Sequence, residues 1–256
     1  MSVVIPFGQC KARPDEGGHQ FWLESHLVAV AQGWGKVDGS YNERLCFLGG
    51  LRHDAAKGRK KWQDNLLGPK GSRPPHAAPG ALLFSYYAAK LLDLWKEQDR
   101  LDRNQMQILR AFVVRVVRDI YDHHRELGDI EEEVPWLHMP EKDLRLHDLD
   151  LAGFHRFVCR YFSTLADFDE PLSQTLEEWK KTFKRKWSRW SNMSRIIPKL
   201  CAGSSLERTD VEKELCIRDD TASFISADRI DAAQISRVNL EPESARLAIT
   251  RLDTYC

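Results

Sequence analysis

Residues 104–121, NQMQILRAFVVRVVRDIY, carry the strongest helical pattern in this chain. Their apolar members recur at spacings of three and four residues, at Met106, Ile108, Leu109, Phe112, Val113, Val116, Val117 and Ile120. This spacing places them on one face of an α-helix, and the width of that face predicts burial on most sides. We therefore expect a central helix here, with other helices packed around it.

Helical periodicity also precedes this segment. It predicts a helix that contains His26 and stops at 33–35, a second over about 42–56, and a third over 80–95. The stretch 68–79 is rich in Gly and Pro and predicts a loop before the third helix. Three helices are thus expected on the N-terminal side.

The sequence after the central helix predicts three more. Two are expected over 149–165 and 172–190, and a last one carries Asp228 and ends at 241–243. The acidic stretch 129–150 contains prolines and predicts an exposed excursion. Because no segment alternates as a β-strand does, the predicted fold class is all-α.

The composition is globular and excludes several classes of protein. The chain has 256 residues, with 38 Lys and Arg against 38 Asp and Glu, so its formal net charge is zero. This zero net charge argues against a protein that coats nucleic acid by electrostatic attraction alone. The longest mainly apolar stretch, 108–120, is interrupted by charges and is shorter than the roughly 20 residues of a membrane span. With no secretory signal and no Cys-x-x-Cys pair, a reduced cytoplasmic location is expected.

Adjacent His53 and Asp54 give the first chemical signal. An imidazole beside a carboxylate suits a divalent first-row metal, and a carboxylate has two oxygens with which to bridge two ions. Lys57 follows Asp54 by three residues, which on a helix places both on one face. Its ammonium could neutralise charge that develops on a phosphate.

Four further features extend this signal: His26, His76, the pair His123 and His124, and Asp228. Each alone has an ordinary structural explanation, such as a core histidine, a loop residue, cations at the negative end of a helix dipole, or an ion pair with a nearby arginine. Their joint order, His…His-Asp-x-x-Lys…His…His-His…Asp, favours a metal site.

That order resembles the HD-domain metal-dependent phosphohydrolases and, more narrowly, the HD nuclease of type I CRISPR systems, the nuclease part of the CRISPR-associated helicase-nuclease. The consecutive histidine pair discriminates best, because general HD phosphohydrolases do not need it. The likeness covers about residues 20–235. It rests on Ser-His-Leu-Val-Ala-Val-Ala at 25–31, Gly-Gly-Leu-Arg-His-Asp-Ala-Ala-Lys at 49–57, Trp-Gln at 62–63, Pro-His-Ala-Ala-Pro-Gly-Ala at 75–81, His-His at 123–124 and Ser-Ala-Asp-Arg-Ile-Asp at 226–231.

The resemblance implies an HD-domain helical bundle with a metal centre between its helices, in which Asp54 bridges two divalent ions. Asp54 and Lys57 are the implied catalytic residues, with Lys57 beside the scissile phosphate. A histidine-rich set of ligands favours Mn, Fe, Co or Ni, whereas Mg prefers oxygen ligands. The implied ligands of the first ion are His26, His53, Asp54 and Asp228, and those of the second are Asp54, His76, His123 and His124.

The family cleaves phosphodiester bonds of single-stranded DNA in CRISPR interference, an antiviral defence, together with a helicase and an RNA-guided targeting complex. The resemblance implies the same activity and partners here, and it implies no membrane as a partner. The sequence contains no Gly-x-x-x-x-Gly-Lys-Ser/Thr phosphate loop, so the helicase motor must lie elsewhere. We expect an HD nuclease domain over 1–235 and a C-terminal segment over 236–256. A linker to a helicase in cis could begin there, or the helicase could be a separate subunit.

A basic stretch follows the metal motif directly. Residues 52–73 contain seven Lys or Arg against two acidic residues. Within it, Arg59, Lys60 and Lys61 are predicted to bind nucleic acid. Arg125 stands where the family commonly has Gly, and could contact DNA or narrow access to the metals.

A second basic stretch, 180–199, contains eight Lys or Arg and no acidic residue. Trp187 and Trp190 are interleaved with these charges. The stretch either forms a track on which bases stack, or it is a helix with a buried aromatic stripe and solvated lysines.

Two other functions remain open from the sequence. One is an HD phosphohydrolase of small nucleotides or cyclic nucleotides, and the other is an inactive HD scaffold that binds a partner. The basic stretches favour a polymer over a small nucleotide as substrate.

Overall fold

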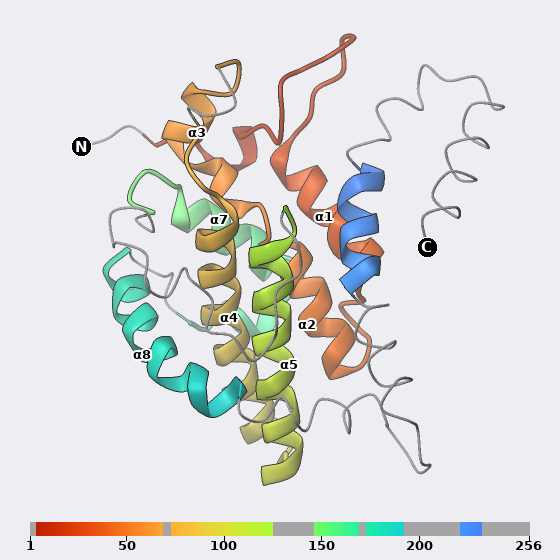
Figure 1. The fold of residues 1–256 in the computed structure, drawn as a ribbon, viewed down its shortest axis with the longest axis vertical. Helices are drawn as coiled ribbons and strands as arrows, with labels where there is room; N and C mark the ends of the chain where they lie inside the picture. The colour runs from red at the N-terminus through yellow and green to blue at the C-terminus, as the bar shows by residue number, and fades with distance from the viewer. Residues whose placement is uncertain (1–3, 69–72, 125–145, 169–172, 192–220, 232–256) are drawn as a thin grey trace, which may run out of the picture.

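A computed structural model of the chain shows a bundle of helices (Figure 1) and describes residues 4–68, 73–124, 146–168, 173–191 and 221–231. Within these ranges the structure contains no β-strand, only isolated bridges between Lys11 and Trp22 and between Glu16 and His19. The predicted all-α class is confirmed. In chain order the elements are η1 (Phe7–Gln9), α1 (Leu23–Trp34), α2 (Tyr41–Gly50), η2 (Ala55–Gly58), α3 (Lys60–Asp64), α4 (Ala77–Gln98), α5 (Arg103–Asp122), α7 (Leu151–Cys159), η5 (Ser163–Leu165), α8 (Ser173–Ser191) and a helix over 221–231.

The central helix is α5, as the apolar pattern predicts. It begins at a capping box formed by Asp102 and Gln105, which satisfies free amides of the first turn. Most of its side chains after Leu109 are buried, and α4 lies alongside it (Figure 1). The helix ends at Asp122 with His123 as its C-cap, so the histidine pair emerges from the centre of the bundle.

The predicted helix over 42–56 is wrong at its C-terminal end, because α2 stops at Gly50. Here α1 and α2 cross so closely that a Cβ atom on Gly50 would lie 2.4 Å from the Cα of Ala31. Glycine allows this approach but is a poor helix former. His53 and Asp54 therefore lie in a turn between α2 and η2, and not in the last turn of a helix.

A glutamine joins η2, which follows that turn, to the N-terminal segment. The Gln63 amide accepts a hydrogen bond from the backbone N–H of Lys11 at 2.9 Å and donates to the carbonyl oxygens of Lys11 at 2.8 Å and Lys57 at 2.7 Å. It thereby ties the N-terminal segment to η2. Neither α3 nor this segment's bridges were expected from the sequence.

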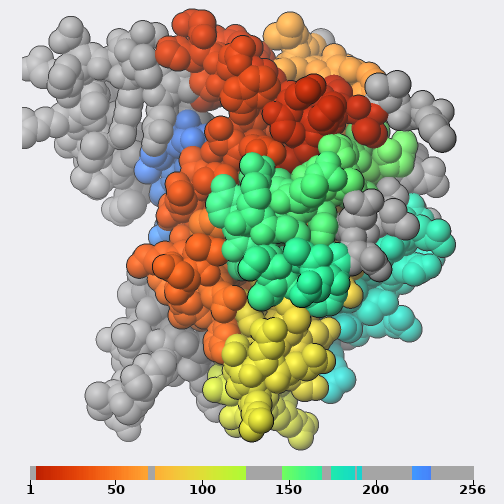
Figure 2. Space-filling model, turned by 180° about the vertical axis from the view of Figure 1, so that it is seen from behind, coloured from red at the N-terminus to blue at the C-terminus, as the bar shows by residue number. Residues whose placement is uncertain are grey.

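The N-terminal segment also packs on α7, as Figure 2 shows from behind. The rings of Phe7 and Phe154 lie 5.0 Å apart, and the backbone N–H of Phe7 donates to the Asp150 carboxylate at 3.0 Å. Asp150 also caps α7, which is shorter than the predicted helix over 149–165.

The structure of the amphipathic helix α8 decides between the two interpretations for part of the second basic stretch. Phe183, Trp187 and Trp190 are buried against the bundle, and the Lys186 ammonium lies 5.6 Å from the Trp190 ring centroid. Buried indoles do not present a face on which bases can stack, so the structural interpretation holds for the described part. Residues 192–199 of this stretch lie outside the described residues.

The helix over 221–231 was predicted, and it docks against α1 (Figure 1). Phe224 stacks on Trp34 with ring centroids 4.1 Å apart. Ala227 lies against Gly33, where an added Cβ would come within 2.7 Å of the alanine Cβ. At the helix start, the Thr221 hydroxyl donates to Asp119 of α5 at 2.9 Å.

Other expectations concern parts of the chain that the structure leaves undescribed. The excursion over 129–150 is described only from residue 146, and the helix end at 241–243 and the segment 236–256 lie outside the described residues. The predicted helix over 80–95 is longer in the structure, since α4 runs from Ala77 to Gln98. Among the described helices, none is long and apolar enough to cross a membrane.

Replacing Gly50 with alanine tests the close crossing of α1 and α2. The added Cβ meets backbone atoms, which cannot rotate away, so we expect Gly50→Ala to lower the free energy of unfolding by about 1–3 kcal/mol. Gly8→Ala is the matched control, because its Cβ would meet nothing closer than 3.5 Å and should cost less than about 0.5 kcal/mol. Urea unfolding measures both, and equal stabilities of the two variants would contradict the crossing.

Candidate metal centre

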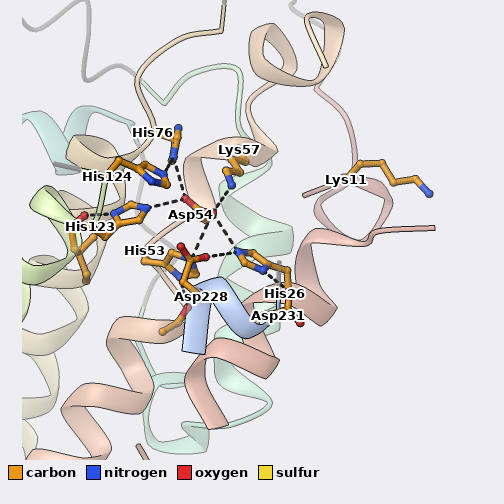
Figure 3. Close-up of polar contacts among 12 residues, drawn as sticks. Lys11, His26, His53, Asp54, Lys57, His76, His123, His124, Asp228 and Asp231 are labelled. Atoms are coloured by element: carbon orange, nitrogen blue, oxygen red, sulfur yellow. Dashed lines mark hydrogen bonds and ion pairs between the residues drawn. The ribbon is translucent and has the colours of Figure 1, made fainter. Parts of the chain in front are cut away.

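The structure brings together all seven predicted metal ligands, although they come from five separate parts of the fold (Figure 3). The ligands are His26 of α1, His53 and Asp54 of the turn after α2, His76 at the N-cap of α4, His123 and His124 at the end of α5, and Asp228 of the helix over 221–231.

Asp54 lies at the centre of the cluster, and its two oxygens face different groups of histidines. Its Oδ1 lies 3.1 Å from Nε2 of His76 and 3.5 Å from Nε2 of His123. Its Oδ2 lies 3.1 Å from Nε2 of His26 and 3.4 Å from Nε2 of His53. The carboxylate is fully buried, and it divides the cluster into two halves.

Each half offers four ligand atoms that lie within 4.8 Å of one another. We call the half at Oδ2 of Asp54 the first site and the half at Oδ1 the second site. The first site is His26, His53, Asp54 and Asp228, and the second is Asp54, His76, His123 and His124. These sets equal those that the resemblance implies, and both could hold a metal ion.

Backbone contacts orient two of the histidines for coordination. Nδ1 of His53 lies 2.8 Å from the carbonyl oxygen of Gly50, and Nδ1 of His123 lies 2.6 Å from that of Ile120. Because a carbonyl only accepts, each Nδ1 donates its hydrogen, and Nε2 of a neutral ring is left with a lone pair. Both Nε2 atoms are buried and have no hydrogen-bond partner among the described residues. Buried acceptors of this kind fit a metal ion.

Electrostatics in the first site favour a cation. Burial lowers the pKa of His53, but the carboxylates of Asp54 and Asp228 outweigh it and raise this pKa to about 9. For Asp54, burial acts to raise the pKa, yet the Lys57 ammonium and His53 hold it well below its usual range. The site therefore draws in a positive charge, as a proton or as a metal ion.

The second site differs, because its outer histidines resist protonation. Burial lowers the pKa of His76, and partial desolvation of the ring together with the neighbouring His123 lowers the pKa of His124 to about 4, although part of the His124 side chain reaches solvent. Their Nε2 atoms lie 2.9 Å apart, and His124 is exposed. Neutral imidazoles at the surface are ready ligands for a metal that arrives from solvent.

Lys57 lies beside Asp54, as their three-residue spacing predicted. Its ammonium forms an ion pair with Oδ2 of Asp54, although it lies on the 3-10 helix η2 and not on an extended α-helix. The side chain retains about 15% exposure, so the charge lies between the buried carboxylate and solvent.

Asp231 also contacts the centre, and the sequence did not predict this role. Its Oδ2 lies 2.7 Å from Nδ1 of His26, on the side of the ring opposite the cluster. Asp231 follows Asp228 by three residues, and in a helix that spacing puts both carboxylates on one face. This spacing within the string at 226–231 was the available signal.

The residues predicted to bind nucleic acid have different surroundings. Arg59 is buried, and its guanidinium pairs with Asp148 at 2.8 Å, so it joins α3 to the segment before α7 and does not face solvent. We correct its assignment to a structural one. Lys60 pairs with Asp64 at 2.6 Å, Lys61 is exposed, and Arg125 lies outside the described residues.

Metal binding tests the shared carboxylate. We expect Mn²⁺ at about 100 times its Kd to stabilise the protein by about 2.7 kcal/mol and to raise Tm by about 5–10 °C. His26→Ala and His124→Ala should each lose part of the bound metal, and Asp54→Asn should lose most of it, since it serves both sites. Thermal unfolding and metal analysis after dialysis measure this.

His147 provides the control for these variants. It is exposed and does not belong to the cluster, so His147→Ala should keep the full thermal shift and metal content. Normal metal content in Asp54→Asn would contradict the arrangement.

Comparisons of the chain with protein-family models, with curated proteins and with solved structures give no match.

Proposed function

We propose that this protein is a divalent-metal-dependent nuclease that hydrolyses phosphodiester bonds of single-stranded DNA. The observation that carries the proposal is the buried Asp54 carboxylate, whose oxygens face two separate sets of ligand atoms. A carboxylate shared in this way is typical of sites that hold two metal ions for phosphoryl chemistry.

The two sites and Lys57 would have different roles in the reaction. The first site would hold one ion and the second site another, and together the ions would supply an activated water and neutralise charge on the phosphoryl oxygens. The histidine-rich ligands favour Mn, Fe, Co or Ni over Mg. Lys57 would contact the phosphate, because its ammonium lies beside Asp54 and keeps a path to solvent.

Three features support a polymeric strand as substrate. The second site is the more open one, through His76 and His124. Lys60 and Lys61 begin α3, three and four residues beyond Lys57, and could bind the strand backbone. The sequence also resembles the CRISPR nucleases, which act in the cytoplasm with a helicase and an RNA-guided targeting complex. In our proposal this chain has the same role and partners.

Cleavage of circular single-stranded DNA is the direct test. We expect the purified protein to cut the circle with Mn²⁺, Co²⁺ or Ni²⁺ and without ATP, and to leave duplex DNA largely intact, since the sequence contains no phosphate loop of a helicase motor. Lys57→Ala should slow cleavage by about 10²–10³-fold, the usual effect of removing a group that stabilises charge in the transition state. Gel analysis of products measures both.

A parallel panel of nucleoside triphosphates and cyclic nucleotides separates the competing functions. Hydrolysis of a small nucleotide without cleavage of DNA would favour the phosphohydrolase alternative. Bound metal with neither activity would favour an inactive scaffold. His147→Ala again serves as the matched control and should cleave normally.

The two lysines at the start of α3, Lys60 and Lys61, give a second test of the proposed function. We expect affinity for single strands to be weak because the net charge of the chain is zero. It should fall steeply with salt because binding would depend on the local basic runs near Lys60 and Lys184. Reversing the charges of Lys60 and Lys61 should weaken binding more than reversing Lys180 and Lys181 of α8. Fluorescence anisotropy at several salt concentrations measures this, and the opposite order would contradict the proposed strand path.

A further inference from the structure

We propose that Asp231 is a positioning residue of the first metal site, which fixes the His26 imidazole so that its Nε2 faces the metal. The inference rests on the metal centre of the proposed function. It assigns a role to a carboxylate outside both ligand sets.

The geometry of His26 carries the inference. Its Nδ1 lies 2.7 Å from Oδ2 of Asp231, while its Nε2 lies 3.1 Å from Asp54 and 3.6 Å from Asp228. Because a carboxylate accepts and does not donate, Nδ1 carries the hydrogen in this contact. Nε2 also lies within hydrogen-bonding distance of Oδ2 of Asp54, and a metal ion held by the first site would take the place of a hydrogen there. With Nδ1 held by Asp231, Nε2 is the atom that faces the metal.

The partner of His26 differs in kind from those of the other oriented rings. His53 and His123 donate to backbone carbonyl oxygens, whereas His26 donates to a full negative charge. A carboxylate in this place raises the basicity of the imidazole and strengthens its bond to a metal. Backbone partners cannot be removed by substitution, so Asp231 offers the accessible test of ring orientation.

One helix thus supplies both a ligand and the support of another ligand. Asp228 and Asp231 lie one turn apart on the helix over 221–231, and both reach His26 of α1. Arg13 of the N-terminal segment is near enough to interact electrostatically with Asp231. Arg13 would compete with His26 for the carboxylate, so the test must report on His26 itself.

A double-mutant cycle provides that report. Calorimetric titration of the metal-stripped full chain with Mn²⁺ is carried out in a His124→Ala background, which weakens the second site and isolates the first. There we expect Asp231→Asn and Asp231→Ala to weaken Mn²⁺ binding about 10–100-fold, the usual effect of removing such a partner. With His26→Ala added, the same substitutions should change affinity less than about twofold, because the partner through which Asp231 acts is gone.

Two control variants distinguish the positioning role of Asp231 from an effect of helix docking and from a general effect of removing a negative charge. Thr221→Val removes the hydrogen bond at the other end of the same helix, and Asp38→Asn removes an exposed charge between α1 and α2. Both should bind Mn²⁺ within about twofold of the parent. If Thr221→Val matched Asp231→Asn, or if Asp231→Asn kept its effect without His26, the positioning role would be overturned.

The outcome is distinguishable from failure of the proposed function. A parent protein that shows the predicted cycle but cuts no DNA would refute the nuclease and leave the role of Asp231 standing. A parent that binds Mn²⁺ equally with and without Asp231 would refute the positioning role alone. A parent that binds no Mn²⁺ would refute both.

Discussion

The burial of one carboxylate, Asp54, is the constraint on which the centre of this fold depends. An ionised carboxylate with no solvent exposure is strongly unfavourable unless opposite charges or donors surround it. Here the Lys57 ammonium supplies part of the compensation, and a positive charge held among four histidine Nε2 atoms, as a proton or as a metal ion, would supply the rest. These histidines are carried by α1, α4, α5 and the turn after α2. The helices must therefore converge where this side chain lies, and that convergence creates two sets of ligand atoms.

The convergence also requires positions without side chains. A Cβ on Gly50 would lie 2.4 Å from Ala31, and a Cβ on Gly80 would lie 2.3 Å from the carbonyl oxygen of His53. These glycines let α1 and the start of α4 approach the turn that carries His53 and Asp54. A larger residue at either position would move backbone that positions a ligand, so packing and coordination geometry are coupled.

The sequence predicted the fold class, the central helix and the residues that cluster in the candidate metal centre, because each depends on residue type and local spacing. The sequence-based predictions were wrong or incomplete where the role of a residue depends on a neighbour that is distant in the chain. Arg59 belongs to a run of basic residues, yet Asp148, 89 residues later, takes it into the interior. Asp231 is one acidic residue among many until the fold brings it to His26, 205 residues earlier. The early end of α2 likewise depends on a crossing with α1, and helical periodicity does not reveal such a crossing.

The two sites differ in how they are assembled, and this difference bears on function. All ligands of the second site lie between residues 54 and 124, whereas the first also needs Asp228 from far along the chain. Closing a long loop costs entropy, although the cost grows slowly with length. The stacking of Phe224 on Trp34 and the packing of Ala227 against Gly33 offset that cost without any metal. Asp228 and Asp231 would therefore already be in place for an ion, so binding would not need to order the helix, and more of the coordination energy would appear as affinity.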